Sequence, residues 1–262
     1  MSRQAVIVTG AARGIGKATA LRLAKDGASL VLNGREAESL REVADAVVQA
    51  GGAAWVCAAD LRKAETASSL VSQCVQEFGR VDGLVNAAGV AKLTPLLELD
   101  LETWKSFFDL HVTPSFLCCQ AVARRMVEQG EGGSIVNVSS VAASMAMYGT
   151  GAYAAAKGAV SSFTRVAAVE WAGHAIRVNA VAPGPVATEQ LRKVYVGPMY
   201  AERARSIPMN RLAEPEEVAD MIAFLLSPAA KYVTGQVLAI DGGASAVGCY
   251  SYETYKRQAP QA

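Results

Sequence analysis

Short runs of apolar residues recur through the first half of the chain, and they restrict the possible folds more than any other feature. Five of them are residues 5–9 (AVIVT), 29–33 (SLVLN), 53–58 (AAWVCA), 83–87 (GLVNA) and 134–139 (SIVNVS). They are rich in valine, isoleucine and leucine and are bounded by glycine or polar residues, a pattern typical of strands buried on both faces. Residues 176–182 (IRVNAVA) and 236–241 (QVLAID) predict two further strands.

Segments with helical periodicity separate these runs. Residues 67–78 place one apolar stripe at helical spacing: Ala67, Leu70, Val71, Cys74, Val75 and Phe78. A later helix is predicted from Pro215, because proline suits a first helical turn. Alternating strands and helices predict parallel strands joined by right-handed crossovers. The expected fold is α/β, a single-domain Rossmann-like doubly wound parallel sheet of about seven strands with helices on both faces, spanning residues 1–262.

Charge and cysteine usage narrow the class of partner. The 25 basic and 24 acidic residues leave a formal net charge of +1, so no overall field attracts nucleic acid or an anionic membrane surface. The five cysteines lack the paired spacing of a metal site and are expected to be reduced, mostly buried thiols of a cytoplasmic protein. Residues 132–156 carry no charge, but their asparagine, serines, tyrosines and glycines argue against a membrane span.

A glycine-rich loop, TGAARGIG, follows the first predicted strand and precedes a predicted helix. Its glycines, Gly10, Gly14 and Gly16, would let the backbone turn sharply and approach a pyrophosphate at the helix N-terminus. A tight turn without a ligand is the alternative.

Several motifs together resemble the short-chain dehydrogenase/reductase family. TGAARGIG, NAAG (86–89), SS (139–140), YAAAK (153–157) and PG (183–184) occur in that family's order and spacing, over residues 3–243. The resemblance implies a nicotinamide dinucleotide as cofactor. It implies that the cofactor contacts Gly10, Arg13, Gly14, Ile15, Gly16, Arg35, Asp60, Leu61, Asn86, Ala87, Gly89, Tyr153, Lys157, Pro183, Gly184, Val186 and Thr188. For Asp60 alone, a helix-capping role is the alternative.

Residues after the second strand indicate which dinucleotide is preferred. Enzymes that use NAD place an acid near this point, where it binds the adenosine ribose. Here Gly34 occupies the place of the acid and Arg35 follows, with a guanidinium suited to a phosphate. Arg13 could supply a second charge, so NADP(H) is expected in preference to NAD(H). Ordinary surface arginines are the alternative, and Glu36 could still reach a ribose hydroxyl.

Tyr153 and Lys157 lie four positions apart and would share one face of an alanine-rich helix. The resemblance implies that Tyr153 is the acid/base, that Lys157 binds the nicotinamide ribose and that Ser140 donates to the substrate oxygen. A free tyrosine has a pKa near 10, so a lysine ammonium and an oxidised nicotinamide would have to lower it. Ser139 is the less favoured neighbour. Without the glycine loop, Tyr153 and Lys157 would be interpreted as ordinary surface residues.

His111 departs from the family pattern, because relatives commonly have asparagine there, holding a water in a proton relay to the lysine. His111 is expected to keep that catalytic task, with a hydrogen-bonded structural histidine as the alternative. Pro114 predicts a bend in the helix near His111.

The expected substrate is a small alcohol or ketone, interconverted reversibly. A 3-oxoacyl-acyl-carrier-protein reductase is the alternative, for which Arg124 and Arg125 supply basic charge while Glu128 and Glu131 oppose it. A catalytically impaired NADP(H)-binding scaffold or sensor is a second alternative, suggested by His111.

Other segments carry weaker expectations. Residues 185–212 are predicted to form a lid-like segment or an irregular connection, and residues 244–262 a C-terminal tail that covers a neighbouring pocket or frays. Helices within residues 104–126 and 153–171 are expected to pair between subunits, as they do in similar proteins, in a homotetramer.

Overall fold

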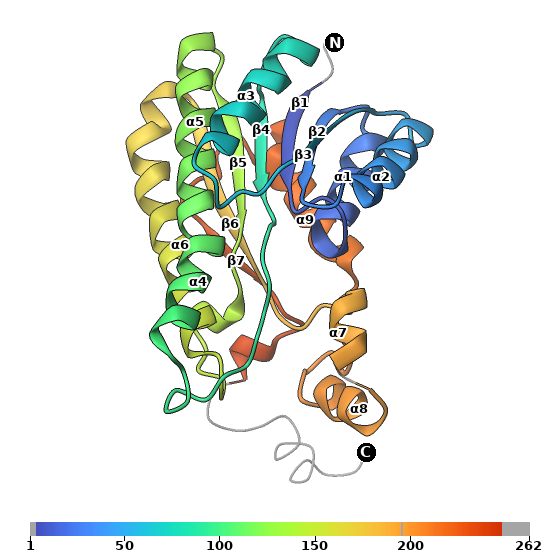
Figure 1. The fold of residues 1–262 in the computed structure, drawn as a ribbon, viewed down its shortest axis with the longest axis vertical. Coiled ribbons are helices and arrows are strands. Elements are labelled where there is room, and N and C mark those ends of the chain that lie inside the picture. The colour runs from blue at the N-terminus through green and yellow to red at the C-terminus, as the bar shows by residue number, and fades with distance from the viewer. Residues whose placement is uncertain (1–3, 195, 248–262) are drawn as a thin grey trace.

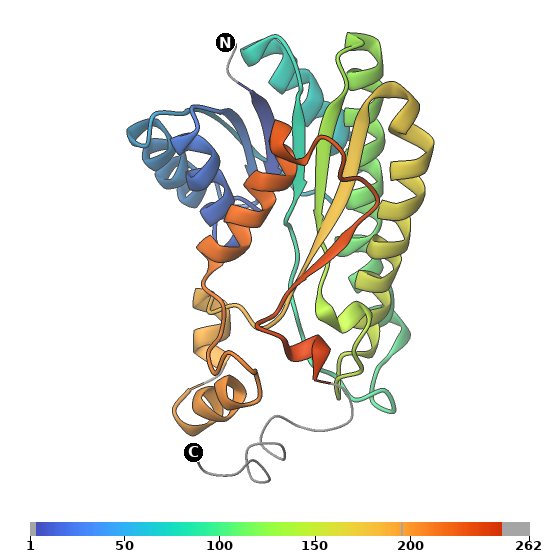
Figure 2. The same ribbon diagram turned by 180° about the vertical axis from the view of Figure 1, so that it is seen from behind.

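The computed structural model describes residues 4–194 and 196–247. Its centre is one parallel sheet of seven strands in the order β3-β2-β1-β4-β5-β6-β7, as Figures 1 and 2 show from opposite sides. The strands are β1 (Ala5–Thr9), β2 (Ser29–Gly34), β3 (Ala53–Ala58), β4 (Gly83–Asn86), β5 (Gly133–Val138), β6 (Ile176–Pro183) and β7 (Val237–Ile240). The α/β fold class predicted from the alternating pattern is confirmed.

Helices cover both faces of the sheet, and each layer buries its own apolar cluster. One layer consists of α1 (Gly14–Lys25), α2 (Ala37–Gln49) and α9 (Pro215–Leu226), seen in front of the sheet in Figure 2. The other consists of α3 (Glu65–Phe78), α4 (Leu101–His111), α5 (Thr113–Gln129) and α6 (Gly151–Trp171). Apolar side chains on both faces keep the central strands away from water.

Strand β3 differs from its prediction. It forms an edge of the sheet and pairs only with β2, and the side chain of Trp55 is 43% exposed. The prediction of a strand buried on both faces is therefore wrong here. A short apolar run does not reveal whether its strand lies at the centre or at the edge.

The helix expected to bend near Pro114 is divided into two. Asp100 caps α4, its carboxylate accepting a hydrogen bond from the Thr103 amide at 2.7 Å, and α4 ends at His111. After Val112 the chain begins α5 with Pro114 in the first turn, where proline leaves no helical hydrogen bond unmade. The break places His111 at a helix end.

Residues 185–212 hold two short helices, α7 (Glu189–Val194) and α8 (Pro198–Arg205). Part of the predicted irregular segment is therefore helical. The predicted tail begins with a 3-10 turn, Ala244–Ala246, and its remainder, residues 248–262, lies outside the described residues. Among the described helices, none has both the length and the apolar character needed to span a bilayer.

Candidate active site

Parallel strands bring their carboxyl ends to one edge of the sheet, and nearly all predicted site residues follow those ends. The chain runs outward from β1 to β3 and then returns to place β4 on the other side of β1. The loops after β1 and β4 therefore separate in opposite directions. In open α/β sheets this divergence forms the crevice that binds ligands.

The glycine loop has little space for side chains. Gly10 and Gly14 have φ angles of +65° and +55°, in the left-handed region that favours glycine. A β-carbon at Gly10 would lie 2.7 Å from the Ala88 backbone, and one at Gly16 would overlap the Gly10 carbonyl. Arg13 precedes α1 without a side-chain cap. The first turn of α1 therefore remains available to an anion.

Buried polar groups fasten the loop after β4 to its neighbours. The Asn86 amide donates to Asn137 Oδ1 at 2.9 Å, and Asn137 donates to Thr164 Oγ1 on α6 at 2.9 Å. The Thr9 hydroxyl accepts a hydrogen bond from the Ala87 amide at 3.1 Å. These bonds fix the predicted turn Asn86, Ala87 and Gly89 relative to α6. Thr9 was not among the predicted site residues, because a threonine at a strand end gives no distinctive sequence signal.

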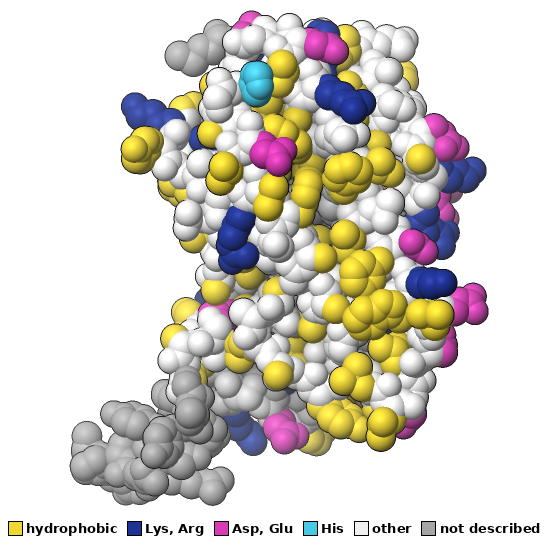
Figure 3. Space-filling model, turned by 90° about the vertical axis from the view of Figure 1, so that its left-hand side faces the viewer, with side chains coloured by type: hydrophobic (Ala, Val, Ile, Leu, Met, Phe, Trp, Pro, Cys, Tyr) yellow, Lys and Arg dark blue, Asp and Glu magenta, His cyan; other side chains and the backbone are white. Residues whose placement is uncertain are grey.

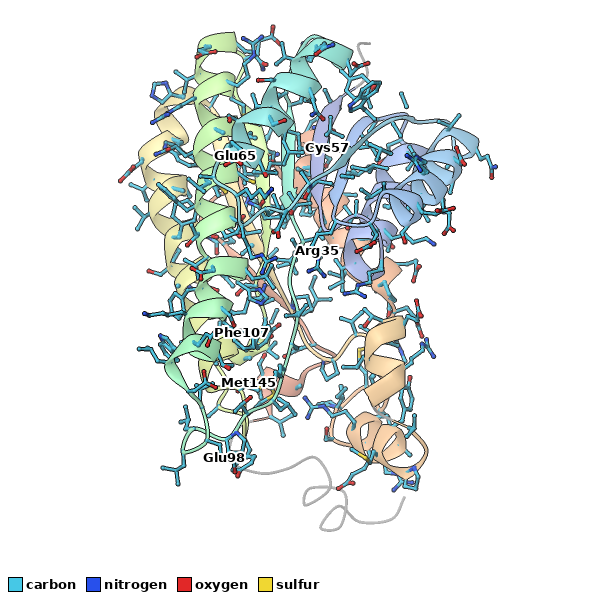
Figure 4. All side chains as sticks on the ribbon, in the orientation of Figure 1. Arg35, Cys57, Glu65, Glu98, Phe107 and Met145 are labelled. Atoms are coloured by element: carbon cyan, nitrogen blue, oxygen red, sulfur yellow. The ribbon has the colours of Figure 1, made fainter. Side chains whose placement is uncertain are left out.

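The two predicted phosphate-binding arginines are exposed. Neither Arg13 nor Arg35 forms an ion pair with any residue that the structure describes. In Figure 4, Arg35 lies beside the lower, carboxyl ends of the strands. A β-carbon at Gly34 would lie 3.3 Å from Leu40 and 3.6 Å from Ala12 of the glycine loop. Gly34 thus lies against the glycine loop, with Arg35 at its rim.

Asp60 and Leu61 follow β3, at the same edge of the sheet. The Asp60 carboxylate accepts hydrogen bonds from Arg62, which lower its pKa to about 2. Its backbone carbonyl accepts a bond from the Thr66 hydroxyl at 2.8 Å, in the first turn of α3. Leu61 is buried. Asp60 therefore organises the start of α3 through its carbonyl, not as a side-chain cap.

The Pro183-Gly184 turn leads back to the glycine loop. A β-carbon at Gly14 would lie 3.2 Å from the Thr188 methyl group, so these two segments approach closely. The Thr188 amide donates to the Val186 carbonyl at 2.7 Å, and the Thr188 hydroxyl accepts from the Leu191 amide at 3.3 Å. Thr188 thus lies against the glycine loop, and its amide is bonded to Val186.

Helix α6 carries Tyr153 and Lys157 on one face, as predicted. The Lys157 ammonium lies 5.8 Å from the centre of the Tyr153 ring and donates to the Val138 carbonyl at 2.7 Å. Ser140 follows β5 and hydrogen-bonds with Tyr153. Tyr153 is half-buried, whereas Ser140 and Lys157 are buried. The three predicted groups therefore lie together.

The adjacent serine has a different environment. Ser139 contacts the Ser161 hydroxyl at 2.7 Å and donates to the Lys157 carbonyl at 3.0 Å. Its hydroxyl is occupied in joining β5 to α6. Ser140, whose hydroxyl accepts a 3.2 Å bond from the Ala142 amide and hydrogen-bonds with Tyr153, is the serine on the Tyr153 side.

Burial shifts the pKa values of Tyr153 and Lys157 so that the neutral form of each is favoured. Burial raises the pKa of Tyr153, and the hydrogen bond with Ser140 opposes this shift. Burial lowers the pKa of Lys157 to about 8. The protein groups alone therefore do not produce the acidic phenol that the sequence interpretation requires. Further stabilisation of the phenolate would have to come from a bound cation, such as an oxidised nicotinamide.

His111 lies beside this pair. Its ring centre is 5.6 Å from that of Tyr153, and Nε2 donates to the Val90 carbonyl at 2.9 Å. Nε2 also lies 3.5 Å from the Val90 amide. The shorter contact is to the carbonyl, which only accepts, and it favours the tautomer with the proton on Nε2 and Nδ1 left as an acceptor. Nδ1 is buried and has no hydrogen-bond partner among the described groups. A β-carbon at Gly89 would lie 2.8 Å from Nδ1 and 3.7 Å from Lys157 Nζ, so both nitrogens face the same point.

The ionisation of His111 differs from that of a free histidine. Burial, followed by the nearby Lys157 charge, lowers its pKa to about 3. The ring is therefore neutral near pH 7. Phe107 stacks on it with ring centres 5.8 Å apart. Phe107 was not predicted as a site residue, although its position four residues before His111 on one helix gave a signal.

Comparisons with known proteins identify the family. A family model described as enoyl-(acyl carrier protein) reductase matches residues 10–245. A 3-oxoacyl-[acyl-carrier-protein] reductase of Synechocystis sp. is 40% identical, over 93% of this chain and 97% of its own. The chain belongs to the short-chain dehydrogenase/reductase family.

Further members of the short-chain dehydrogenase/reductase family show its breadth. A cis-4-hydroxycyclohexanecarboxylate dehydrogenase of Sinomonas cyclohexanicum is 42% identical, over 94% of this chain and 98% of its own. A 7α-hydroxysteroid dehydrogenase solved with NADH and 7-oxo glycochenodeoxycholic acid superposes with a TM-score of 0.87 at 34% identity, covering 92% and 94% of the two chains. The present short-chain dehydrogenase/reductase is therefore an oxidoreductase of a family that uses nicotinamide cofactors.

Proposed function

We propose that the protein catalyses the reversible reduction of a small ketone to an alcohol with NADP(H), using Tyr153 as acid/base. The observation that carries this proposal is the grouping of Ser140, Tyr153 and Lys157 at the edge of the sheet where the glycine loop opens. Its relatives are oxidoreductases of CH–OH and C=O groups.

The residues present fit a dinucleotide. Gly10 and Gly14 adopt left-handed backbone angles, and Gly10 and Gly16 leave no space for side chains beside the uncapped start of α1. This loop would hold the pyrophosphate, and Val186 and Thr188 would hold the nicotinamide end. When bound, the dinucleotide supplies or accepts the hydride.

The protein groups would then manage the proton. The Tyr153 hydroxyl donates a proton to the carbonyl oxygen during reduction and takes it back during oxidation. Ser140 donates a hydrogen bond to the same oxygen and shares its developing charge. Lys157 orients the ribose, and the Val138 carbonyl keeps its ammonium in place.

His111 extends this proton pathway. Its protonated Nε2 is fixed by Val90, so Nδ1 offers a permanent acceptor toward Lys157. One water between the two nitrogens would donate a hydrogen bond to Nδ1 and accept one from Lys157, so that His111 would position this water while protons pass between Lys157 and the water. This arrangement favours a catalytic His111 over the purely structural alternative, and it argues against the impaired scaffold.

The preference for NADP(H) is supported by charge. Arg13 and Arg35 are exposed at the crevice, and neither forms an ion pair with a described residue. A 2′-phosphate beside Arg35 could accept charge-assisted hydrogen bonds from the guanidinium. The acid that would bind the NAD ribose is replaced by Gly34.

The alternative substrate is a 3-oxoacyl group on acyl carrier protein, favoured by the 40% identity to a reductase of that substrate. The basic surface that this acidic partner would need is partly neutralised. Arg125 lies 3.5 Å from Glu128, and Glu131 binds Arg80 at 2.7 Å. Only Arg124 remains as an exposed arginine on this part of α5. A free small molecule is therefore the better substrate.

The assembly that fits the surface is a homotetramer. Figure 3 shows hydrophobic side chains gathered on the α5 and α6 side of the molecule. Phe116, Val127, Val166 and Val169 are 42%, 41%, 53% and 80% exposed. Burying such a patch between copies removes apolar area from water.

The proposed location is the cytoplasm. The four described cysteines are free thiols, as expected in a reducing compartment.

The decisive experiment measures NADPH and NADH oxidation across aliphatic, cyclic, aromatic and sugar-derived ketones, with Tyr153→Phe as the test variant. Removing the hydroxyl should lower kcat at least about 1000-fold, since acid/base catalysis and oxyanion contacts are lost together. Dinucleotide binding, followed by fluorescence, should change less than about threefold. Dinucleotide binding with no turnover of any ketone would favour the scaffold instead.

A further inference from the structure

Helix α8 reaches the catalytic segment through one arginine. Arg203 Nη2 lies 3.5 Å from Met147 Sδ. Met147 belongs to the segment between Ser140 and Tyr153, and its carbonyl accepts a 2.7 Å bond from the Thr150 hydroxyl, just before α6 begins. Arg203 is therefore held close to the loop that connects two of the candidate catalytic residues.

This guanidinium is not paired with a carboxylate. Two other arginines near it are: Arg192 binds Glu214 at 3.0 Å, and Arg211 binds Glu217 at 2.7 Å. Arg203 forms no ion pair with any described residue. Its only hydrogen-bond partner there is a thioether, a weak acceptor. The half-buried guanidinium therefore has N–H donors left for a ligand.

The surroundings of Arg203 are mainly apolar. The loop after β4 touches the Met147 segment, because the Thr94 amide donates to the Gly149 carbonyl at 2.8 Å. Leu93, Leu96 and Tyr148 remain 59%, 68% and 87% exposed along this contact. Figure 4 shows Met145 and Glu98 on the same side of the molecule, and the exposed Glu98 forms no ion pair with Arg203. Arg203 thus lies close to a loop with exposed apolar side chains, which also carries the exposed Lys92.

We propose that Arg203 binds a carboxylate on the substrate, so that the protein selects hydroxy acids and keto acids with an apolar body. This inference rests on the proposed function, whose substrate class it specifies. A guanidinium binds a carboxylate through two parallel N–H bonds. The guanidinium and the exposed apolar side chains beside it fit a carboxylate on an apolar body.

The test compares an acid with its uncharged analogue, 4-oxocyclohexanecarboxylate with its methyl ester, in steady-state kinetics. Arg203→Met retains the length and apolar character of the side chain and removes its charge. We expect the ratio of kcat/KM for acid over ester to fall about 10- to 100-fold, the range for losing a charged hydrogen bond. Arg203→Lys should recover part of the ratio. Arg205→Met, an exposed neighbour on α8, should leave the ratio unchanged.

Calorimetric binding of 4-hydroxycyclohexanecarboxylate with NADP+ present separates this inference from the proposed function. Binding that depends on Arg203, without turnover of any ketone, supports the anion site and rejects the reaction. If acid and ester are both turned over, and the ratio of their kcat/KM values is the same in wild type, Arg203→Met and Arg205→Met, the inference is overturned while the proposed reaction is retained. If Arg203→Met lowers kcat/KM more for the phosphate ester of 4-hydroxycyclohexanone than for the acid, the site is assigned to phosphate and the carboxylate assignment is overturned.

Discussion

His111 shows how neighbouring groups set the state of one buried side chain. The neighbouring carbonyl of Val90 fixes its tautomer, and burial keeps it neutral. An asparagine side chain at this position would carry both a donor and an acceptor that can exchange places by rotation. The histidine offers a fixed donor and a fixed acceptor. The fold therefore determines which ring nitrogen of His111 donates and which accepts.

The low pKa of His111 makes a prediction about acid stability. The folded pKa of about 3 lies below the ordinary 6.5, so the unfolded chain binds the extra proton. Stability from this residue is complete above pH 6.5 and is lost as pH falls toward 3, by at most about 1.4 kcal/mol per pH unit. His111→Gln should therefore flatten the decline in unfolding free energy between pH 6.5 and 4, measured by urea titration. The exposed His174→Gln should reproduce the wild-type slope, and an equal effect of both variants would contradict the assignment.

Arg35 makes a prediction about cofactor choice. Replacing it with alanine should raise the Kd for NADPH about tenfold or more, because charge-assisted bonds to the 2′-phosphate are lost. The Kd for NADH should change less than about threefold. Fluorescence titration of both dinucleotides measures this, with the exposed Arg41→Ala on α2 as a matched control. Equal weakening of both dinucleotides would place Arg35 away from the phosphate.

At the residue scale, motif spacing predicted which side chains gather in the site but not their states. Tyr153, Lys157 and Ser140 could be chosen because their spacing in the chain is distinctive. The tautomer of His111 and the contact between Arg203 and Met147 depend on backbone groups from other elements. Such contacts leave no pattern in a single sequence.

Among the elements, polar side chains inside the sheet connect strands to helices. The Asn86 amide bonds both Asn137 and Cys119, and Asn137 continues to Thr164 on α6. Side-chain hydrogen bonds therefore join β4, β5 and α6, in addition to the backbone hydrogen bonds between the strands. These hydrogen bonds hold α6 in a fixed position relative to the turn after β4.

Breaking these hydrogen bonds should lower stability. Asn86→Ala leaves the buried Asn137 oxygen with only the weak Cys119 thiol as a donor at 3.5 Å, and should cost roughly 1 to 3 kcal/mol. The urea midpoint should fall without a change in m-value. The double variant with Asn137→Ala should cost less than the sum of the two single changes, because they share one bond. Additive costs would show that the two amides act independently.

The elements were predicted with unequal success. The seven strands follow from apolar runs, because burial requires them. The edge position of β3 was not predicted, because it depends on the absence of a neighbouring strand on one side. The division between α4 and α5 was not predicted either, because it depends on where the chain turns. Helices α7 and α8 are too short to show a clear period.

At the scale of the whole molecule, one side carries an aromatic and aliphatic surface. The rings of Phe116, Phe163 and Trp171 form a chain of contacts between α5 and α6, with centres 5.9 and 6.4 Å apart. Exposed valines extend it along α6. Both helices also shape the site, so an assembly through this side would stiffen the helix that carries Tyr153.

Charge placed on this side should disrupt the assembly. Val169→Asp puts a carboxylate where the side chain is 80% exposed, so the isolated subunit should still fold while paired copies bury an uncompensated charge. Light scattering after gel filtration should show four chains for the wild type and fewer for the variant. Val48→Asp, 59% exposed on α2, should leave the mass unchanged. A wild type of a single chain would contradict the proposed tetramer.

The buried cysteines have a consequence for the folded protein as a whole. Cys57, Cys74, Cys118 and Cys119 are buried, and burial raises the pKa of each thiol. Only the thiolate attacks an electrophile. While the chain is folded, these sulfurs therefore resist alkylating agents, and they become reactive when the sheet opens. The rate at which an added alkylating agent modifies these thiols would therefore report how often the core opens.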